Sequence, residues 1–579
     1  MKKVSDIVFD FIADQGIDTV FTVSGGGCMH LTDSLGKNTR LQYICNHHEQ
    51  GCAMAAEGYA RTKNNAGCIL VTTGPGGTNA LTGVLCAFQD SIPMIIISGQ
   101  VPSGQLSKNT RCRQIGQQEF NIVDTVKHMT KYSTIITDAS IILYELQKSF
   151  HIATSGRPGP VWIDIPLDIQ SSLVETSKLK LYEASINYTT YNRIIDLSYL
   201  KALQKCISKS KKPMIVIGGG IKASNTTKQL KNFLYQTGIP VVSGPHSAVD
   251  VINNDYPYYA GRFGLLGQKT SNYLIQESDL IISLGSRLNP KMIGYDSLKF
   301  APLAKKFIID IDNNELNKLN LSNINYKWNI DLKIFFNLVT NLKPPNIKDW
   351  QQHIISTRQN ETLVLPKHRN IKKYVSTYVF AEELQKSLKK DSIIVTSDGT
   401  AHVVPLKTIQ LKADQQLFSN EGTAPMGYGL PASIGAYYGS KKPIICIEGD
   451  GSLMMNLQEL ETIKYHNLPI KIFIINNGGY LSIKLTQNSF FNGHLVASNQ
   501  DSGVSIPSYE KISKAFGYRY YNIKSNKTIH QTLKRVFTNN ECCIIEVFTD
   551  PNELHEPKVR AKGIDHNGKI IPGELTDIS

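Results

Sequence analysis

Two polar residues in the last third of the chain have the types and spacing needed to hold a metal ion. Asp450 lies three residues after the end of the apolar run 443–447, and Asn477 lies two residues after the end of the largely apolar run 471–475. Apolar residues recur at helical spacing between the two runs. Carboxylate and amide oxygens are ligands that suit Mg²⁺ beside a phosphate group. We therefore predict a metal and phosphate site in this segment.

The glycines beside Asp450 favour the same chemistry. Both apolar runs read as buried parallel strands, so Asp450 and Asn477 should lie at the carboxyl ends of neighbouring strands, where ligands bind in open sheets. Gly449 and Gly451 would let the backbone approach a phosphate. Ser452 is predicted to cap a single helix that includes Leu453 to Ile463. A Gly-Asp-Gly turn alone is weak evidence, but its pairing with Asn-Asn across one helix and one strand is specific.

Three blocks of alternating strands and helices are predicted to position these residues. Short apolar runs end repeatedly in glycine, as at 68–73 before Gly74, which is typical of βαβ units. The fold class is therefore α/β, with three doubly wound parallel-sheet domains, and the first and last blocks have similar patterns. The predicted boundaries are 1–185, 193–345 and 373–550, with polar segments at 171–192 and 343–372 and an irregular tail at 551–579.

Composition narrows the class of protein. The 62 basic and 48 acidic residues give a net charge of +14, but they are scattered, so we expect no nucleic-acid partner. The apolar runs are strand-length, far from the ~20 residues of a membrane span, and we expect no membrane partner. Asp6 and Asp10 interrupt the first apolar stretch, which argues against a signal peptide. None of the ten cysteines forms a CxxC pair, so we expect no structural zinc and a cytoplasmic location.

Several motifs together resemble those of thiamine diphosphate-dependent enzymes. The Gly-Asp-Gly to Asn-Asn pattern is similar to the thiamine diphosphate fingerprint. The remaining motifs resemble acetolactate (acetohydroxyacid) synthase catalytic subunits, in order, from about residue 4 to 550. They are His48-Glu49-Gln50-Gly51, Ala56-Glu57-Gly58-Tyr59-Ala60-Arg61, Thr73-Gly74-Pro75-Gly76-Gly77-Thr78-Asn79, Ser98-Gly99-Gln100-Val101-Pro102, Thr154-Ser155-Gly156-Arg157-Pro158-Gly159-Pro160 and Met426-Gly427-Tyr428-Gly429-Leu430-Pro431.

The resemblance implies a role for each matching residue. Glu49 would hydrogen-bond N1′ of the cofactor's aminopyrimidine ring and so promote loss of the thiazolium C2 proton. Asp450, Asn477 and the backbone carbonyl of Gly479 would bind Mg²⁺, and Met426 would support the bent cofactor. The other implied residues are Gln100 and Gln118 at the edge of the catalytic site, and Thr73, Gly74, Asn79, His402, Gly422, Gly449, Gly451 and Ser452 around the cofactor.

The resemblance also implies an activity and an assembly. The expected reaction is decarboxylation of a 2-oxo acid, with pyruvate as donor, and transfer of the two-carbon unit to an acceptor carbonyl. In this family each site lies between two chains, so we expect a homodimer or homotetramer. Three alternatives stay open: a decarboxylase or lyase of the same superfamily, a carboligase acting on a ketosugar nucleotide, and a regulatory or scaffold protein without turnover.

Two departures from the family pattern leave undecided whether the protein binds a flavin and which acceptor it uses. The middle block resembles a flavin-binding domain, but Asn289 and Lys291 replace an Asp and an Arg of the flavin motif, so FAD is a possible cofactor rather than an implied one. Thr486 and Gln117 replace a Trp and a Phe of the acceptor pocket, which should make that pocket roomier and wetter. A side chain from 480–500 could refill the space; Tyr480, Phe490 and Phe491 are the candidates. Segment 478–500 is predicted to be a mobile lid.

Overall fold

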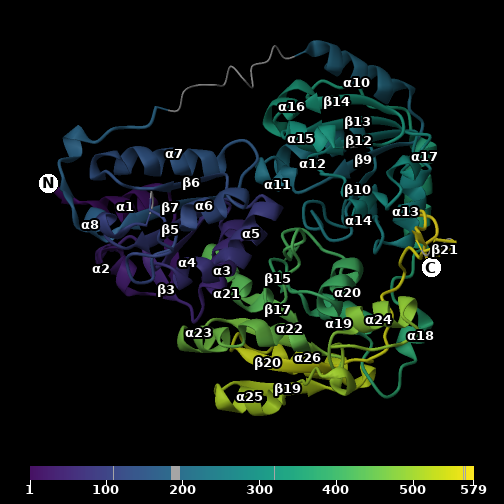
Figure 1. Cartoon of the computed structure of the whole chain (residues 1–579). Helices are drawn as coiled ribbons and strands as arrows, with labels where there is room; N and C mark the ends of the chain where they lie inside the picture. The colour runs from purple at the N-terminus through teal and green to yellow at the C-terminus, as the bar shows by residue number, and fades with distance from the viewer. Residues whose placement is uncertain (108–109, 184–195, 319, 565, 568) are drawn as a thin grey trace.

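The chain contains three units, and each is built around a six-stranded parallel sheet with helices on its faces (Figure 1). The computed structural model describes residues 1–107, 110–183, 196–318, 320–564, 566–567 and 569–579. The predicted fold class is therefore confirmed. The later part of the predicted linker, residues 184–192, lies outside the described residues.

The N-terminal unit lies on the left of Figure 1. Its sheet order is β3 (Gln42–Cys45), β2 (Thr19–Thr22), β4 (Gly67–Val71), β5 (Met94–Gln100), β7 (Pro160–Pro166) and β6 (Tyr132–Ile135). Its helices are α1 (Val4–Asp14), α2 (Met29–Lys37), α3 (Glu49–Lys63), α4 (Pro75–Asn79), α5 (Leu81–Asp90), α6 (Ile122–Thr125), α7 (Ile142–Thr154) and α8 (Leu167–Ser171). A short antiparallel pair joins β1 (Lys2–Lys3) to β8 (Leu173–Val174).

The C-terminal unit repeats this topology. Its sheet order is β16 (Gln416–Phe418), β15 (Ile393–Thr396), β17 (Ile444–Gly449), β18 (Ile470–Asn476), β20 (Cys543–Phe548) and β19 (Arg519–Ile523). Numbered within each unit, both sheets run 2-1-3-4-6-5, so the similarity of the first and last blocks extends to strand order. Its helices are α18 (Pro366–Arg369), α19 (Thr377–Ser387), α20 (Thr400–Thr408), α21 (Gly429–Ser440), α22 (Asp450–Leu453), α23 (Glu459–Tyr465), α24 (Leu481–Phe490), α25 (Tyr509–Ala515) and α26 (Ile529–Val536).

The central unit has a different order, 3-2-1-4-5-6, which is that of a dinucleotide-binding sheet. Its strands are β11 (Tyr259–Arg262), β10 (Val241–Ser243), β9 (Pro213–Ile217), β12 (Leu280–Leu284), β13 (Lys305–Asp310) and β14 (Ile324–Asn329). Its helices are α10 (Leu197–Lys209), α11 (Gly220–Ala223), α12 (Thr227–Thr237), α13 (Lys269–Gln276), α14 (Pro290–Ile293), α15 (Asn313–Asn317), α16 (Leu332–Leu338) and α17 (Lys348–Gln359).

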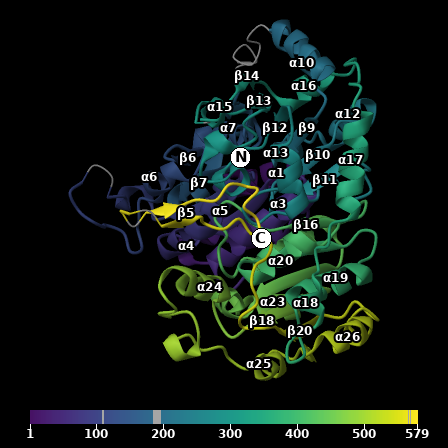
Figure 2. The same cartoon turned by 90° about the vertical axis from the view of Figure 1, so that its right-hand side faces the viewer.

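The polar segment 343–372 is largely helical. Helix α17 lies at the outer edge of the central unit (Figures 1 and 2). Its Trp350 and Ile354 are buried in the apolar core of that unit. The packing of the central unit therefore continues past residue 345.

The N- and C-terminal units share one apolar core and meet through α3 and α21. Glycines allow these helices to approach closely. A Cβ at Gly435 would lie 1.7 Å from the Ala55 carbonyl oxygen, and a Cβ at Gly58 would lie 2.1 Å from that of Ala432. The Gly- and Ala-rich sequence of both helices therefore follows from this contact.

Two sequence predictions about local structure were wrong. The single helix after Asp450 is interrupted by a 3₁₀ turn at Met454–Asn456, between α22 and α23. Asn456 donates its amide to the Gly427 carbonyl at 2.8 Å, a distant contact that favours the break. Ser452 lies inside α22 instead of capping it, because its hydroxyl accepts a hydrogen bond from the Gly427 N–H at 2.8 Å.

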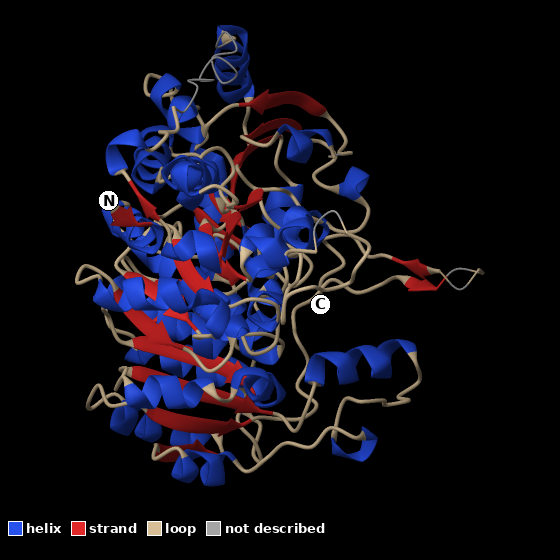
Figure 3. Ribbon diagram, turned by 60° about the vertical axis from the view of Figure 1, so that its left-hand side comes forward, coloured by secondary structure: helices blue, strands red, loops and turns tan. Residues whose placement is uncertain are grey.

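The tail is more ordered than predicted. Strands β21 (Gly563–Ile564) and β22 (Ile570–Ile571) form a short antiparallel hairpin that projects from the body of the protein (Figure 3). The chain then returns to the central unit, where Leu575 is buried in its core. Among the described residues, no helix is both long and apolar enough to cross a membrane.

Candidate functional site

Asp450 and Asn477 come together as predicted, at the carboxyl ends of adjacent parallel strands. Strands β17 and β18 pair in register, and Asp450 and Asn477 each follow directly. The Asp450 Oδ2 atom accepts hydrogen bonds from the N–H groups of Asn477 (3.1 Å), Gly478 (2.8 Å) and Gly479 (3.1 Å). Its Oδ1 atom accepts one from Gly451 at 2.7 Å. The carboxylate thus organises both turns.

The polar atoms of this cradle fit a bound cation. The Asn477 Oδ1 atom is buried and has no hydrogen-bond partner among the described residues, whereas its amide nitrogen lies 3.5 Å from the Thr400 hydroxyl. Burial raises the pKa of Asp450 to about 6 although four N–H groups contact it. An unpaired amide oxygen beside a buried carboxylate is a donor set that suits Mg²⁺.

Glycine is required at two positions of the cradle. Gly479 has φ of 136°, and a Cβ there would lie 2.5 Å from the Ser498 carbonyl oxygen. A Cβ at Gly451 would lie 2.3 Å from the Tyr480 ring, which packs on this turn. Larger residues would displace the backbone that a diphosphate must approach.

The segment with Met426 is tied to the same turn. Ser452 contacts the Ser397 hydroxyl at 2.7 Å as well as the Gly427 N–H. Met426, which precedes Gly427, is half-buried. The structure therefore brings the predicted diphosphate turn and the predicted cofactor support together within the C-terminal unit.

Glu49 occupies the corresponding edge of the N-terminal sheet. It is the first residue of α3, and the His48 side chain caps this helix by accepting a hydrogen bond from the Gln50 N–H. The Glu49 side chain is buried, and its Oε2 atom accepts a hydrogen bond from the Asn79 amide at 3.0 Å. Thr73, at the turn before α4, donates its hydroxyl to the Gly99 carbonyl at 3.0 Å. Glu49 and Asn79 are thus in direct contact, and Thr73 and Gly74 form the turn that begins the helix containing Asn79.

The two predicted glutamines have different surroundings. The Gln100 amide donates to Asp164 Oδ2 at 2.9 Å and to the Phe120 carbonyl at 3.0 Å, and its oxygen accepts from the Val101 N–H. Its polar atoms are therefore used inside the N-terminal unit. Gln118 is exposed and has φ of 66°, and its backbone carbonyl oxygen, not its side chain, lies against Gly74.

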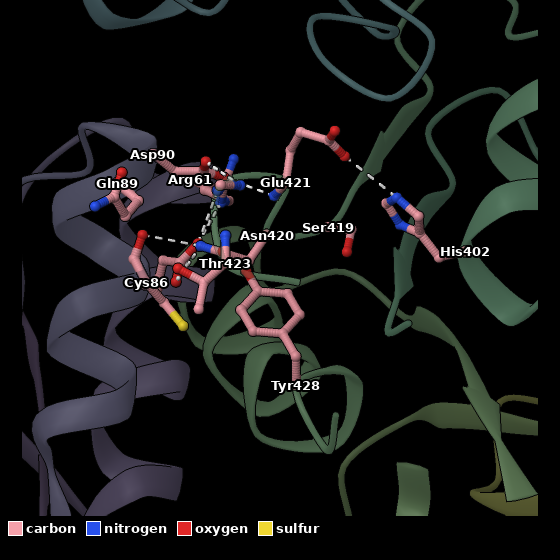
Figure 4. A network of polar contacts seen from close by, with 12 residues as sticks. Arg61, Cys86, Gln89, Asp90, His402, Ser419, Asn420, Glu421, Thr423 and Tyr428 are labelled. Carbon is pink, nitrogen blue, oxygen red and sulfur yellow. Dashed lines mark hydrogen bonds and ion pairs between the residues drawn. The ribbon is translucent and has the colours of Figure 1, made fainter. Parts of the chain in front are cut away.

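The segment that contains Gly422 is anchored on the N-terminal unit. Gly422 donates its N–H to Asp90 Oδ1 at 2.8 Å, and Asp90 also forms an ion pair with Arg61 at 2.5 Å (Figure 4). Asn420 contacts the buried Glu57 at 3.1 Å. These contacts set the path of the chain toward Met426.

Each half of the predicted cofactor site is assembled within its own unit. The partner of Glu49 is in the N-terminal unit, and the partners of Asp450 are in the C-terminal unit. The two units of one chain contact each other beside Glu49, where Asn46 donates its amide to Glu459 at 2.8 Å.

His402 lies in a buried group that the sequence did not predict. Its Nε2 atom lies 3.3 Å from Glu421 Oε2, and His246 of the central unit approaches the same oxygen. Neither His246 nor Glu421 was selected from the sequence, since an isolated His or Glu carries no pattern.

The residues that depart from the family pattern are also placed. Thr486 is exposed on α24, and Phe490 and Phe491 at the end of this helix are 42% and 60% exposed. Asn289 caps α14 by accepting a hydrogen bond from the Met292 N–H at 3.2 Å. Helix α24 accounts for 10 of the 23 residues in segment 478–500.

Comparison with known proteins gives consistent matches along the chain. Three family models of thiamine pyrophosphate enzymes match the chain. The N-terminal TPP binding domain matches residues 2–126, the central domain matches residues 200–331, and the C-terminal TPP binding domain matches residues 398–547. The acetolactate synthase isozyme 2 large subunit of Escherichia coli is 30% identical over 94% of this chain and 95% of its own. The acetolactate synthase large subunit of Lactococcus lactis is 30% identical over 100% of this chain and 99% of its own. The chloroplastic acetolactate synthase of Arabidopsis thaliana is 31% identical over 82% of this chain and 70% of its own.

Proposed function

Because this chain belongs to the thiamine pyrophosphate enzymes, we propose that it is a thiamine diphosphate- and Mg²⁺-dependent carboligase. It would decarboxylate a 2-oxo acid, with pyruvate as the donor, and transfer the two-carbon unit to an acceptor carbonyl. The relatives named acetolactate synthase support this reaction class. The alternative of a regulatory protein without turnover is disfavoured, since Glu49, Asp450 and Asn477 are all present.

The chain's residues would divide the work between the two half-sites. Bound thiamine diphosphate would supply a nucleophilic carbon and an electron sink for decarboxylation. Glu49 would hold the proton at N1′ of the aminopyrimidine, and Asn79 keeps its carboxylate oriented. Asp450, Asn477 and the Gly479 carbonyl would bind the Mg²⁺ that neutralises the diphosphate.

The observation that carries this proposal is the buried, unpaired Asn477 Oδ1 atom beside the buried Asp450 carboxylate. The test is incubation with pyruvate, thiamine diphosphate and Mg²⁺, with products followed by mass spectrometry. Acetolactate identifies a carboligase that uses a second 2-oxo acid, and free acetaldehyde identifies the decarboxylase alternative. No consumption of pyruvate by cofactor-loaded protein would contradict the proposal.

We also propose that the working site lies between two chains of a homodimer or homotetramer. Glu49 and Asp450 are fixed by different units, and Met454 and Met455, directly after the cofactor turn, are 41% and 44% exposed. Exposed apolar side chains beside a site are typical of a surface that another subunit covers. Mixing Glu49→Gln protein with Asp450→Asn protein should restore partial activity after subunit exchange. No recovery, with exchange confirmed, would place both halves of the site in one chain.

The acceptor is proposed to be bulkier or more polar than a simple 2-oxo acid. Thr486 is exposed where related enzymes have an aromatic residue, and Gln117 is exposed as well. We expect slow acetolactate formation and little preference for 2-oxobutyrate over pyruvate, because one methylene discriminates by only about 1–3 kcal/mol even in a fitted pocket. Fast turnover with a strong bias to the 2-oxobutyrate product would contradict this. A ketosugar nucleotide is the alternative acceptor to assay.

Flavin binding is a separate proposal. The central sheet has the strand order of dinucleotide-binding domains, which supports FAD, whereas Asn289 and Lys291 depart from the flavin motif. The absorbance spectrum of the purified protein, and of the material released on denaturation, shows whether the protein binds FAD.

A further inference from the structure

Two buried histidines and a largely buried glutamate, from two units, converge outside the predicted Mg²⁺ cradle. His246 follows β10 of the central unit, His402 lies in α20, and Glu421 follows β16. Figure 4 shows the Glu421 carboxylate turned away from Arg61 and toward His402. The two histidine side chains are 2% and 4% exposed, and that of Glu421 is 13% exposed. The group is therefore sealed between the central and C-terminal units.

The polar atoms of this group face one another at ion-pair distance, but none of them makes a hydrogen bond of good geometry to a described residue. His246 Nδ1 and His402 Nε2 each lie 3.3 Å from the same oxygen, Oε2 of Glu421. All four imidazole nitrogens and this oxygen lack a hydrogen-bond partner among the described residues. Buried polar groups are rarely left unpaired, because desolvation without a partner is costly. Their convergence calls for something between them.

The two histidine–glutamate distances match the edge of a metal coordination tetrahedron. Ligand atoms at about 2.0–2.1 Å from a tetrahedral ion are separated by about 3.3 Å, whereas cis ligands of an octahedral ion would be about 2.9 Å apart. The two histidine–glutamate separations of 3.3 Å agree with the tetrahedral value, and all three ligand atoms lie within 4.8 Å of one another. Two imidazoles and a carboxylate are a donor set for zinc-class metals.

The other carboxylate oxygen is already held in place. Lys291 approaches Glu421 Oε1 at 3.3 Å, which leaves Oε2 to face both histidines. Such outer contacts commonly orient a metal-binding carboxylate. Thr400, two residues before His402, contacts Asn477. His402 was itself predicted to lie near the cofactor, so the group borders the cofactor site but uses none of the predicted Mg²⁺ ligands.

We propose that His246, His402 and Glu421 bind a divalent transition metal of the zinc class, with tetrahedral geometry and a fourth position open to water. This ion would be distinct from the Mg²⁺ of the cofactor. Since His246 belongs to the central unit and the other two ligands to the C-terminal unit, the ion also fastens the two units together.

The experiment uses the full-length protein, loaded with thiamine diphosphate and excess Mg²⁺ so that the oxygen-ligand cradle is filled. Co²⁺ or Zn²⁺ is added, and free metal is removed by gel filtration. We expect one tightly held ion per chain, the intense visible bands of tetrahedral Co²⁺, and a higher unfolding temperature than in protein without the ion. Octahedral Co²⁺ in the cradle would give only weak bands.

Variants assign the ion to its ligands. Glu421→Gln and His246→Gln should each bind the metal at least about tenfold more weakly and lose the tetrahedral bands. His466→Gln, which removes a histidine outside the group, and Asp450→Asn, which alters the cradle, should both keep them. If a ligand variant fails to fold, chelation of the wild-type protein provides the second readout and should lower its unfolding temperature. Absence of tetrahedral Co²⁺ in the wild type, or its retention in folded ligand variants, would overturn the proposal.

Discussion

Replacement of Asp450 by Asn should abolish the stabilising effect of the cofactor while hardly changing the stability of the protein without it. The carboxylate accepts N–H groups on both oxygens, from Gly451 on one and from Asn477, Gly478 and Gly479 on the other. An Asn offers only one oxygen. If the Asn oxygen takes the place of Oδ2 and accepts the same three N–H groups, the Asn amide group faces the Gly451 N–H, which then has no acceptor. One buried donor left unpaired costs about 1–3 kcal/mol.

An opposing contribution of similar size comes from the charge. Burial raises the pKa of Asp450 from 3.8 to about 6. The folded state therefore binds the proton more tightly than the unfolded chain, and stability falls as pH rises through this range. Above pH 6 the ionised carboxylate costs the folded state about 3 kcal/mol, at about 1.4 kcal/mol per pH unit. Asn removes this cost, so the two contributions nearly cancel at pH 7.

The assay is thermal unfolding at pH 7 with and without Mg²⁺ and thiamine diphosphate, supported by calorimetric titration. A ligand at 100 times its dissociation constant stabilises the folded state by about 2.7 kcal/mol, and we expect the wild type to show an increase of this kind. The Asp450→Asn protein should unfold near the wild-type temperature without cofactor and show little increase with it. If the cofactor raised the unfolding temperature equally and bound equally tightly in both proteins, Asp450 would not bind Mg²⁺. If Asp450→Asn lowered the unfolding temperature strongly without cofactor, the two opposing contributions would not cancel.

Three further predictions concern a buried ion pair, the helix contact between two units and a buried acid. Arg61→Met should destabilise the protein by about 3–5 kcal/mol, because it removes the cation that pairs with the buried Glu57 carboxylate; an unchanged unfolding temperature would contradict this. Gly435→Ala should destabilise the protein by about 1–3 kcal/mol or more, because the new methyl group clashes with α3. The control Gly36→Ala lies in a helix with open space around it and should stabilise the protein by about 0.5–1 kcal/mol. Equal effects of the two substitutions would refute the close helix contact. Burial raises the pKa of Asp164 to about 7, so its ionisation lowers stability as pH rises from about 4 to 7, and Asp164→Asn should flatten the change of unfolding temperature with pH; an unaltered pH profile would contradict this.

The sequence predicted best what depends on short-range pattern. The strands predicted at 443–447 and 471–475 were located to within two residues at each end, as β17 and β18, because apolar residues dominate both runs. Asp450 and Asn477 were brought together correctly, since residues after adjacent parallel strands must share an edge of the sheet. The similarity of the first and last blocks likewise follows from their repeated strand–glycine–helix pattern.

What the sequence could not show depends on contacts between distant segments. The helix after Asp450 breaks where Asn456 hydrogen-bonds Gly427, and no pattern within 453–463 reveals that partner. The internal hydrogen bonds of Gln100 likewise require the position of Asp164 on a neighbouring strand. The group around His402 draws one ligand from another unit, so its members have no characteristic spacing. Sequence patterns thus locate residues on elements, whereas the contacts between units decide which atoms are paired.

The most direct test of the central claim is the rate of hydrogen–deuterium exchange at C2 of thiamine diphosphate bound to the protein. In the wild type, Glu49, held by Asn79, should make this exchange fast. In Glu49→Gln, with cofactor binding confirmed by calorimetry, the exchange should slow by at least about 100-fold, in the range that a positioned acid–base group contributes. An exchange rate that is equal in the two proteins would contradict the account, because Glu49 would then have no part in activating the cofactor.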